Sequence, residues 1–381
     1  MKTILRTFVG CTAILFGTAC MGAVKYVPEN MKVELSLKVP GNNAVNYKLH
    51  PDKLENSYFD YEWRSDNKLP ITVFHKVEER DSCMRLTVQL TAAQDVYFNY
   101  RQLLSTGYRH DNCQFYMPGF WYRRNLRSPK KAPSFHTSDS WLVREDRLSA
   151  PLTGIFSEKE KRFMTVNRLD DFSMDALATH KEGEIILSGK TSLGFTGFEN
   201  QQGIAMLSFG FPYREAPKSY IRKLTLAPEV EAFQLMKKGE SVLLTWEIME
   251  SGADDFSDFI QHTWEHCYDT YAPKPVENSY SIADMKQVLS CFFVNSLVDN
   301  QPLVYNSGIH LKVSDCERNG QAEVGFIGRV LLNAFNAWEY GWQSNREELK
   351  VNSTKIFDSY LKNGFTQAGF FKESVNFDKG Y

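Results

Sequence analysis

Alternation of apolar and polar residues runs through the first two thirds of this 381-residue chain. Successive side chains of a β-strand point to opposite faces, so a period of two predicts antiparallel strands with one buried and one wet face. Many such runs at short spacing, separated by Gly, Pro and Asn, predict a large β-sandwich. The clearest runs cover residues 31–39, 84–90, 96–100, 185–187, 204–211, 221–226 and 242–248.

The period changes beyond residue 254. Over residues 255–269, apolar side chains recur at i, i+3 and i+4, which predicts one buried face of a helix. Two prolines in residues 271–275 predict an extended linker, because proline stops a helix. Three more helices are expected, over residues 281–298, 321–342 and 346–362. The buried face of the first of these helices should consist of Ile282, Met285, Leu289, Phe292 and Phe293.

The predicted fold class is therefore multidomain, a large antiparallel β-sandwich followed by a helical domain. We expect a signal peptide over residues 1–23, the sandwich over 24–250, a linker helix with a proline-containing linker over 251–275, and the helical domain over 276–381. Apolar helix faces left without partners favour an incomplete helical domain over a small helical cap on the sandwich.

The N-terminus has a positively charged start, a short apolar run over residues 8–16 and then small residues. This pattern predicts a secretory signal, and the run is too short to span a membrane. We therefore expect a periplasmic or secreted protein. Because of Cys20, an outer-membrane lipoprotein is left open as the alternative, and its only membrane contact would be a lipid anchor on that cysteine. Against this alternative, Gly17 occupies a position where a lipobox prefers an aliphatic residue.

A net charge of -2 argues against a nucleic-acid partner, because general nucleic-acid binders carry a basic excess. Beyond the predicted signal there is an odd number of cysteines without a CxxC spacing. This pattern predicts neither a framework of several disulfides nor a zinc site, and a single disulfide bridge is left open as an alternative. The sequence has no phosphate loop, dinucleotide fingerprint or G-x-S-x-G elbow, so we predict no cofactor. The oligomeric state is left open.

Aromatic and basic residues concentrate in residues 115–131. Aromatic faces stack on the C–H faces of sugar rings, and guanidinium groups hold carboxylates with two hydrogen bonds. Because Pro-Gly and Ser-Pro pairs mark a loop, we interpret the segment as a binding loop for an acidic sugar such as a uronate. The alternative is a hairpin with inward aromatics. The candidate substrate-binding residues are Trp121, Tyr122, Arg123, Arg124 and Asn125, with Arg127 following.

Two further motifs have simpler interpretations. Glu145 and Asp146 are neighbours in a predicted strand and point to opposite faces, so salt bridges with flanking arginines are expected, with a supporting role at a site edge as the alternative. His262 and His266 fit the H-x-x-E-H pattern of inverted zinc proteases. They lie on the polar side of the predicted helix, toward solvent or the sandwich surface, and no third ligand offers itself. We predict no metal site.

The order of sandwich, linker helix and helical hairpins resembles bacterial glycoside hydrolases with a six-hairpin (α/α) toroid, particularly exported polysaccharide-degrading enzymes of gut Bacteroidetes. The resemblance covers residues 30–381, and only the first hairpins of a toroid fit within them. It implies a glycoside hydrolase-like protein acting on a polysaccharide or oligosaccharide, uronate-containing glycans included. The alternatives are a polysaccharide lyase, a non-catalytic glycan-binding protein or a truncated remnant. The segments that carry the resemblance are 252–256, 264–268, 271–273, 323–328 and 338–341.

Glycoside hydrolysis needs two carboxyl groups, about 5 Å apart for retention or about 6.5–9.5 Å apart for inversion. Asp315, Glu317 and Glu323 cluster in the polar stretch that leads into the predicted helix over residues 321–342, where helix N-termini of a toroid would face the central funnel. The helix dipole favours the charged carboxylate, which suits a base or nucleophile. These three are the candidate catalytic residues. The alternative is capping of the helix N-terminus.

Overall fold

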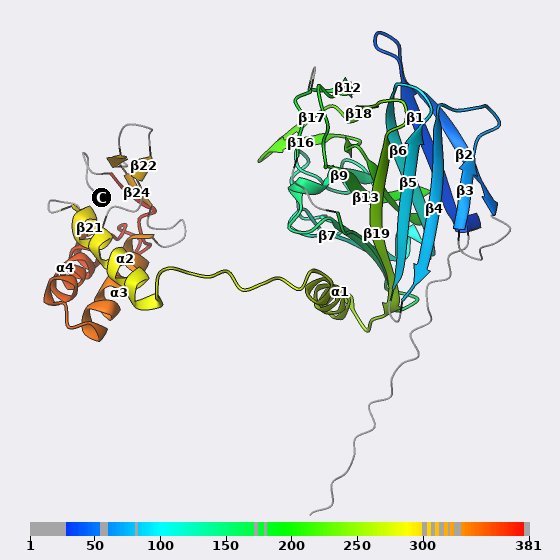
Figure 1. Cartoon of the computed structure of the whole chain (residues 1–381). Helices are drawn as coiled ribbons and strands as arrows, with labels where there is room; N and C mark the ends of the chain where they lie inside the picture. The colour runs from blue at the N-terminus through cyan, green and yellow to red at the C-terminus, as the bar shows by residue number, and fades with distance from the viewer. Residues whose placement is uncertain are drawn as a thin grey trace, which may run out of the picture. The chain divides into compact units, whose positions relative to one another are not determined.

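The computed structural model describes most of the chain beyond residue 27 (Figure 1). The chain divides into two compact units, Met1–Ala272 and Pro273–Tyr381. The predicted signal peptide and Cys20 lie outside the described residues. The described ranges are 28–53, 60–80, 83–170, 174–178, 181–298, 303–305, 309–311, 316–318, 321–323 and 329–376, with backbone alone at 53, 309–311, 316–318, 321–323, 329 and 375.

The strands of the first unit form one hydrogen-bonded assembly of 17 strands, which is described below as two antiparallel sheets that one strand joins (Figure 1). In spatial order, the first sheet contains β1 (Met31–Lys38), β6 (Val96–Arg109), β14 (Ile204–Phe211), β13 (Phe195–Gln201) and β9 (Trp141–Arg144). The second contains β3 (Asp60–Arg64), β4 (Ile71–Glu79), β5 (Met84–Ala92), β19 (Ser241–Gly252), β11 (Arg162–Arg168), β10 (Leu152–Ser157), β7 (Cys113–Met117) and β8 (Trp121–Arg123).

Smaller strands complete this unit. β2 (Val45–Lys53) pairs with β1 through its first half and with β3 through its second half, and so joins the two sheets. Beside β6 lies β18 (Val230–Met236), which also pairs with β12 (Gly183–Ile186) and β15 (Arg214–Glu215). A hairpin is formed by β16 (Ser219–Arg222) and β17 (Thr225–Ala227). The predicted large antiparallel β architecture is confirmed.

The core lies between the two sheets. Along β5, Met84, Leu86, Val88 and Leu90 are all buried, as their alternation predicts. The ring of Trp246 on β19 lies 6.4 Å from Tyr100 of β6 and 5.1 Å from Phe209 of β14. Each large apolar side chain buried in this way contributes about 1.5–3 kcal/mol to stability. The inward positions of both sheets thus form one core.

Helix α1 (Phe256–Tyr271) packs against the second sheet. Its first turn is capped by Asp255, whose carboxylate accepts hydrogen bonds from the backbone N–H groups of Ser257 and Asp258. Phe259 is fully buried against Phe156 and Phe163. The predicted helix and its buried face are therefore confirmed.

The second unit is helical, with short strand pairs. Its helices are α2 (Ile282–Ser296), α3 (Arg329–Gln343) and α4 (Glu347–Asn363). The strand pairs are β20 (Leu297–Val298) with β21 (Val304–Tyr305), β22 (Ile309–Leu311) with β23 (Cys316–Arg318), and β24 (Gln321–Glu323) with β25 (Ser374–Asn376). The β-then-α order is confirmed. Within the described residues, none of the helices has the length and apolar character that crossing a membrane requires.

Two helix predictions in this unit were wrong. Residues 321–323 begin no helix, because they pair as β24 with a strand far along the chain, and α3 begins at Arg329. The predicted inward face of α2 is largely exposed: Ile282 is 74% and Leu289 60% exposed, and Met285 and Phe292 are exposed as well. The buried side of α2 instead carries Ser290, which accepts a hydrogen bond from Arg346, while Phe293 is only partly buried.

Candidate functional site

The aromatic-rich segment forms the β7–β8 hairpin and the loop that follows it. Alternation along the hairpin turns Phe115, Met117 and Trp121 into the core. Trp121 is fully buried, 5.0 Å from Phe198 and 5.8 Å from Trp141, and its indole N–H donates to a backbone carbonyl. A ring without exposed surface cannot stack on a sugar. The prediction was therefore wrong for Trp121, and the inward-packing alternative holds there.

Asn125 shapes the loop. Its backbone has a φ of 47°, in the left-handed region that Asn adopts more readily than most residues. Its side-chain oxygen accepts from the N–H of Tyr122 at 3.1 Å, and its amide donates to the carbonyls of Phe120 and Pro133 at 3.2 Å each. These backbone contacts show that Asn125 organises the loop, and its contact with substrate remains a prediction.

Arg124 has a similar structural role. Its guanidinium donates to the backbone carbonyls of Cys113 at 3.2 Å and of His110 at 3.4 Å, and also to that of Asp111. It lies over the ring of Phe135, 5.3 Å from the ring centre. The contacts fasten the loop to the start of β7. Arg124 thus has a structural role in the loop, and because it also lines the depression, its contact with a carboxylate remains a prediction.

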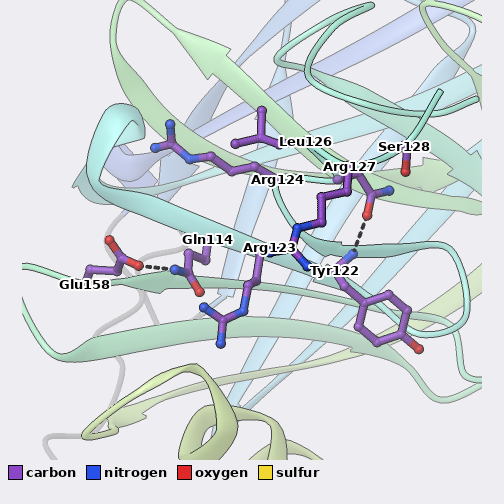
Figure 2. Close-up of a pocket in the computed structure, with 9 residues that line it drawn as sticks. Gln114, Tyr122, Arg123, Arg124, Leu126, Arg127, Ser128 and Glu158 are labelled. Atoms are coloured by element: carbon purple, nitrogen blue, oxygen red, sulfur yellow. Dashed lines mark hydrogen bonds between the residues drawn. The ribbon is translucent and has the colours of Figure 1, made fainter. Parts of the chain in front are cut away.

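The remaining candidates surround a surface depression of about 670 Å³ (Figure 2). Tyr122 is 52% exposed, and its hydroxyl oxygen accepts the N–H of Gly119 at 3.1 Å, which holds the ring in place. The guanidinium of Arg123 lies 5.0 Å over the ring of Phe256 on α1. Arg123 and Arg127 are exposed, and among the described residues neither forms a salt bridge, although, together with the backbone hydrogen bonds that Asp255 accepts, Arg123 is close enough to help lower the pKa of that carboxyl. Figure 2 shows the side chains of Arg123 and Arg124 pointing in different directions.

Two lining residues come from elsewhere in the sheet. Gln114 of β7 donates a hydrogen bond to Glu158, in the turn after β10 (Figure 2). The pairing of β7 with β10 brings them together, since Gln114 lies opposite Phe156. The sequence analysis missed both residues, because nothing in their spacing indicates this pairing.

The depression is suited to an anion. Three arginines and one glutamate line it, so the formal charge of the lining is 3 − 1 = +2. An exposed guanidinium presents two parallel N–H donors to a carboxylate, and the Tyr122 ring offers an apolar face to a sugar. Glu158 is the one carboxylate among the described lining residues, whereas glycoside hydrolysis needs two. The arrangement can bind an acidic sugar, but it does not hold the carboxylate pair for hydrolysis.

The candidate catalytic carboxylates lie in the second unit. Asp315 is outside the described residues, and Glu317 in β23 and Glu323 in β24 are described only by their backbone. Since α3 begins at Arg329, Glu323 is not in the first turn of a helix, so the helix-dipole argument was wrong for it. The catalytic role of the three remains a prediction.

Glu145 and Asp146 lie in a short 3-10 helix, η3 (Glu145–Arg147), where a strand was predicted. Asp146 forms the expected surface pair with Arg144 at 2.9 Å. Glu145 is fully buried, pairs with Arg168 of β11 at 2.7 Å, and accepts the N–H of Gly194. Burial raises the pKa of Glu145 to about 7, against the opposing effects of these two contacts. The two carboxylates thus have separate, structural contacts.

The two histidines of the H-x-x-E-H pattern contact different carboxylates. His262 lies 3.5 Å from Asp258 on its own helix, whereas His266 reaches Glu247 of β19 at 3.1 Å. The expectation that these histidines face solvent or the sandwich surface is confirmed. The pair does not form the metal site of an inverted zinc protease.

No protein-family model and no curated protein matches this chain. Similar solved structures include a polysaccharide lyase, with 11% identity and a TM-score of 0.31, covering 88% of this chain and 54% of the lyase. A GH36 alpha-galactosidase from Geobacillus stearothermophilus has 8% identity and a TM-score of 0.33, and the match covers 57% of this chain and 30% of the galactosidase. A protein from Synechocystis sp. PCC 6803 has 7% identity and a TM-score of 0.30, and the match covers 57% of this chain and 73% of the Synechocystis protein.

Two of these three neighbours are enzymes that act on carbohydrates. This chain spans about half the length of the lyase and less than a third of the galactosidase. At TM-scores this low, the likeness assigns neither a family nor an activity. What the site can do rests on its own residues.

Proposed function

We propose that this protein binds an acidic glycan, and that uronate carboxylates are the groups it recognises in the depression beside β8. One observation carries the proposal. The exposed guanidinium groups of Arg123 and Arg127 have no salt-bridge partner among the described residues, and they flank an exposed Tyr122 ring that is fixed by a hydrogen bond. Exposed cations that form no salt bridge, beside a fixed aromatic ring, suit a ligand that carries both an anion and an apolar face.

The expected affinity is modest for one sugar unit. A hydrogen bond to a charged group contributes about 1.5–3 kcal/mol, so contacts to Arg123 and Arg127 together reach about 4 kcal/mol. This corresponds to a Kd on the order of 1 mM. A polymer presents many uronates and binds more tightly through repeated contacts. Because both cations are exposed, added salt should weaken binding.

A polysaccharide lyase is the second candidate function, and the same depression favours it. A lyase removes the proton beside a neutralised carboxylate, the bond to the leaving sugar oxygen breaks, and an unsaturated end forms. Arg123 and Arg127 would neutralise the carboxylate. Tyr122, as the phenolate, would take the C–H proton at the oxygen that also accepts Gly119 N–H, and the phenol so formed would pass that proton to the leaving sugar oxygen. Hydrolysis, the activity that the resemblance to toroid glycoside hydrolases implies, would depend on the predicted catalytic residues Asp315, Glu317 and Glu323.

Incubation of the purified chain with neutral and uronate-containing polysaccharides tests the proposal. We expect binding to the uronate chains, weakened by salt, and no measurable binding to the neutral chains. New reducing ends without ultraviolet absorbance would assign a hydrolase, reducing ends with absorbance a lyase, and binding alone a glycan-binding protein. Folded protein that binds neutral chains as well as uronate chains would contradict the proposal.

A further inference from the structure

Three metal-binding side chains meet where α1 packs on the second sheet. The thiol of Cys83, the carboxylate of Glu247 and the imidazole of His266 each place one donor atom within 4.8 Å of the others. They come from three separate segments: the residue before β5, the middle of β19, and the third turn of α1. Glu247 is 4% and Cys83 8% exposed, and the His266 side chain is 18% exposed, so two of the donors are buried and the third lies at the edge of the interior.

The spacing of these donors suits zinc. Zn²⁺ binds nitrogen and oxygen at about 2.0–2.1 Å and sulfur at about 2.3 Å, usually with tetrahedral geometry. Tetrahedral bonds of these lengths place neighbouring donors about 3.3–3.6 Å apart. His266 Nε2 and Glu247 Oε2 are 3.1 Å apart, and the thiol sulfur is at most 4.8 Å from either. A cation between them therefore requires only small side-chain movements.

Neighbouring contacts orient the carboxylate. Arg85 donates to Oε1 of Glu247 at 2.9 Å, so the other oxygen, Oε2, faces His266. The hydroxyl of Thr270 donates to Oε2 at 3.1 Å. Hydrogen bonds of this kind hold metal-binding carboxylates in position. A thiolate and a carboxylate together offset the charge of a dication, and the Arg85 guanidinium, which contacts Oε1, leaves a net charge of +1 on the cluster.

We propose that Cys83, Glu247 and His266 bind a divalent cation of the zinc type, and that the cation fastens α1 to the sandwich. Three protein ligands leave a fourth position for water, as in zinc sites with thiolate, imidazole and carboxylate donors. His262 is not part of this site, because it pairs with Asp258. The H-x-x-E-H motif thus contributes one ligand, and the other two come from the sheet.

Zinc and cobalt titrations of the metal-free full chain test this proposal. Zn²⁺ at 100 times its Kd should raise the melting temperature by roughly 5 °C. Co²⁺ should produce the charge-transfer absorption of a cobalt–thiolate bond. Both effects should be lost in Cys83→Ser and in His266→Gln, and the matched variant His262→Gln, on the same helix, should keep them.

Each variant is compared with its own metal-free form, so a change in basal stability does not hide the effect of the metal. A wild-type chain without a melting shift and without cobalt–thiolate absorption would overturn the proposal. Equal losses in His262→Gln and His266→Gln would also overturn it, since they would indicate that the helix motif itself binds the metal. If Cys83→Ser does not fold, the wild-type cobalt spectrum still decides whether a thiolate is a ligand.

Discussion

Replacing Arg168 by methionine should lower the free energy of unfolding by about 3–5 kcal/mol at pH 8, the cost of breaking a buried ion pair. The side chains of Arg168 and Glu145 are 3% and 0% exposed, and their charged atoms are 2.7 Å apart. Methionine fills similar space but removes the buried cation, so at pH 8 the Glu145 carboxyl is either charged and uncompensated in the core or must take up a proton from solvent, and both cost stability. Arg168 also pairs with Asp170, but that side chain is 26% exposed and can turn to water. Urea-induced unfolding measures the loss.

The loss should be smaller at pH 5. Burial raises the pKa of Glu145 to about 7, above the ordinary value of 4.5, so the folded state binds this proton more tightly than the unfolded state. The stability that this proton provides is complete below pH 4.5 and is lost as the pH rises through 7. Removing Arg168 raises the pKa of Glu145 further, so the carboxyl is neutral at pH 5. If Arg168→Met lost the same unfolding free energy at pH 5 and at pH 8, this would contradict the raised pKa of Glu145 in the folded state.

Arg162→Met is the matched control. Arg162 forms a pair with Glu250 at 2.9 Å, but its side chain is 42% exposed. Exposed pairs contribute about 1 kcal/mol or less. The control should therefore lose little stability at either pH.

Phe259→Ala should cost about 3–5 kcal/mol of unfolding free energy, as large-to-small changes at buried aromatic positions do. Phe259 is fully buried, and its ring lies 4.9 Å from that of Phe163. Its fit depends on Gly154, because a Cβ at that glycine would come within 2.5 Å of the Phe259 ring. We expect urea unfolding to show the loss and hydrogen exchange to show faster opening of α1.

Tyr268→Ala, on the same helix, is the control for this substitution. Its side chain is 65% exposed, so the change should stay within about 0.5 kcal/mol. A loss below about 1 kcal/mol in Phe259→Ala would indicate that α1 does not unfold together with the sandwich.

The sequence predicts a strand or helix best where the buried face of that element can be recognised from the apolar spacing within its own segment. The alternation over Met84–Ala92 predicts β5, and the apolar spacing from Phe256 predicts α1, because each pattern depends on its own segment alone. Elements that depend on distant partners are missed. Residues 321–323 look helical from their own spacing but pair with β25, and the side of α2 that packs carries Ser290, which contacts the distant Arg346, together with the partly buried Phe293.

The candidate site was predicted in part for the same reason. Composition marks residues 121–127 as aromatic and basic, but only packing separates the buried Trp121 from the exposed Tyr122. Hydrogen bonds to backbone carbonyls, which leave no trace in the sequence, commit Arg124 to the loop. Glu158 lines the depression because β7 pairs with β10, which places the turn after β10 beside Gln114.

The most direct test of acidic-glycan binding is a calorimetric titration of the Arg123→Gln/Arg127→Gln double variant with a uronate oligosaccharide. Each lost charged contact is worth about 1.5–3 kcal/mol, so the affinity should fall at least about tenfold per arginine. The control Lys68→Gln/Lys238→Gln removes the same charge from exposed positions that do not line the depression, and should bind like the unchanged protein. An unchanged affinity in the arginine variant, or an equal loss in the lysine control, would contradict binding in this depression.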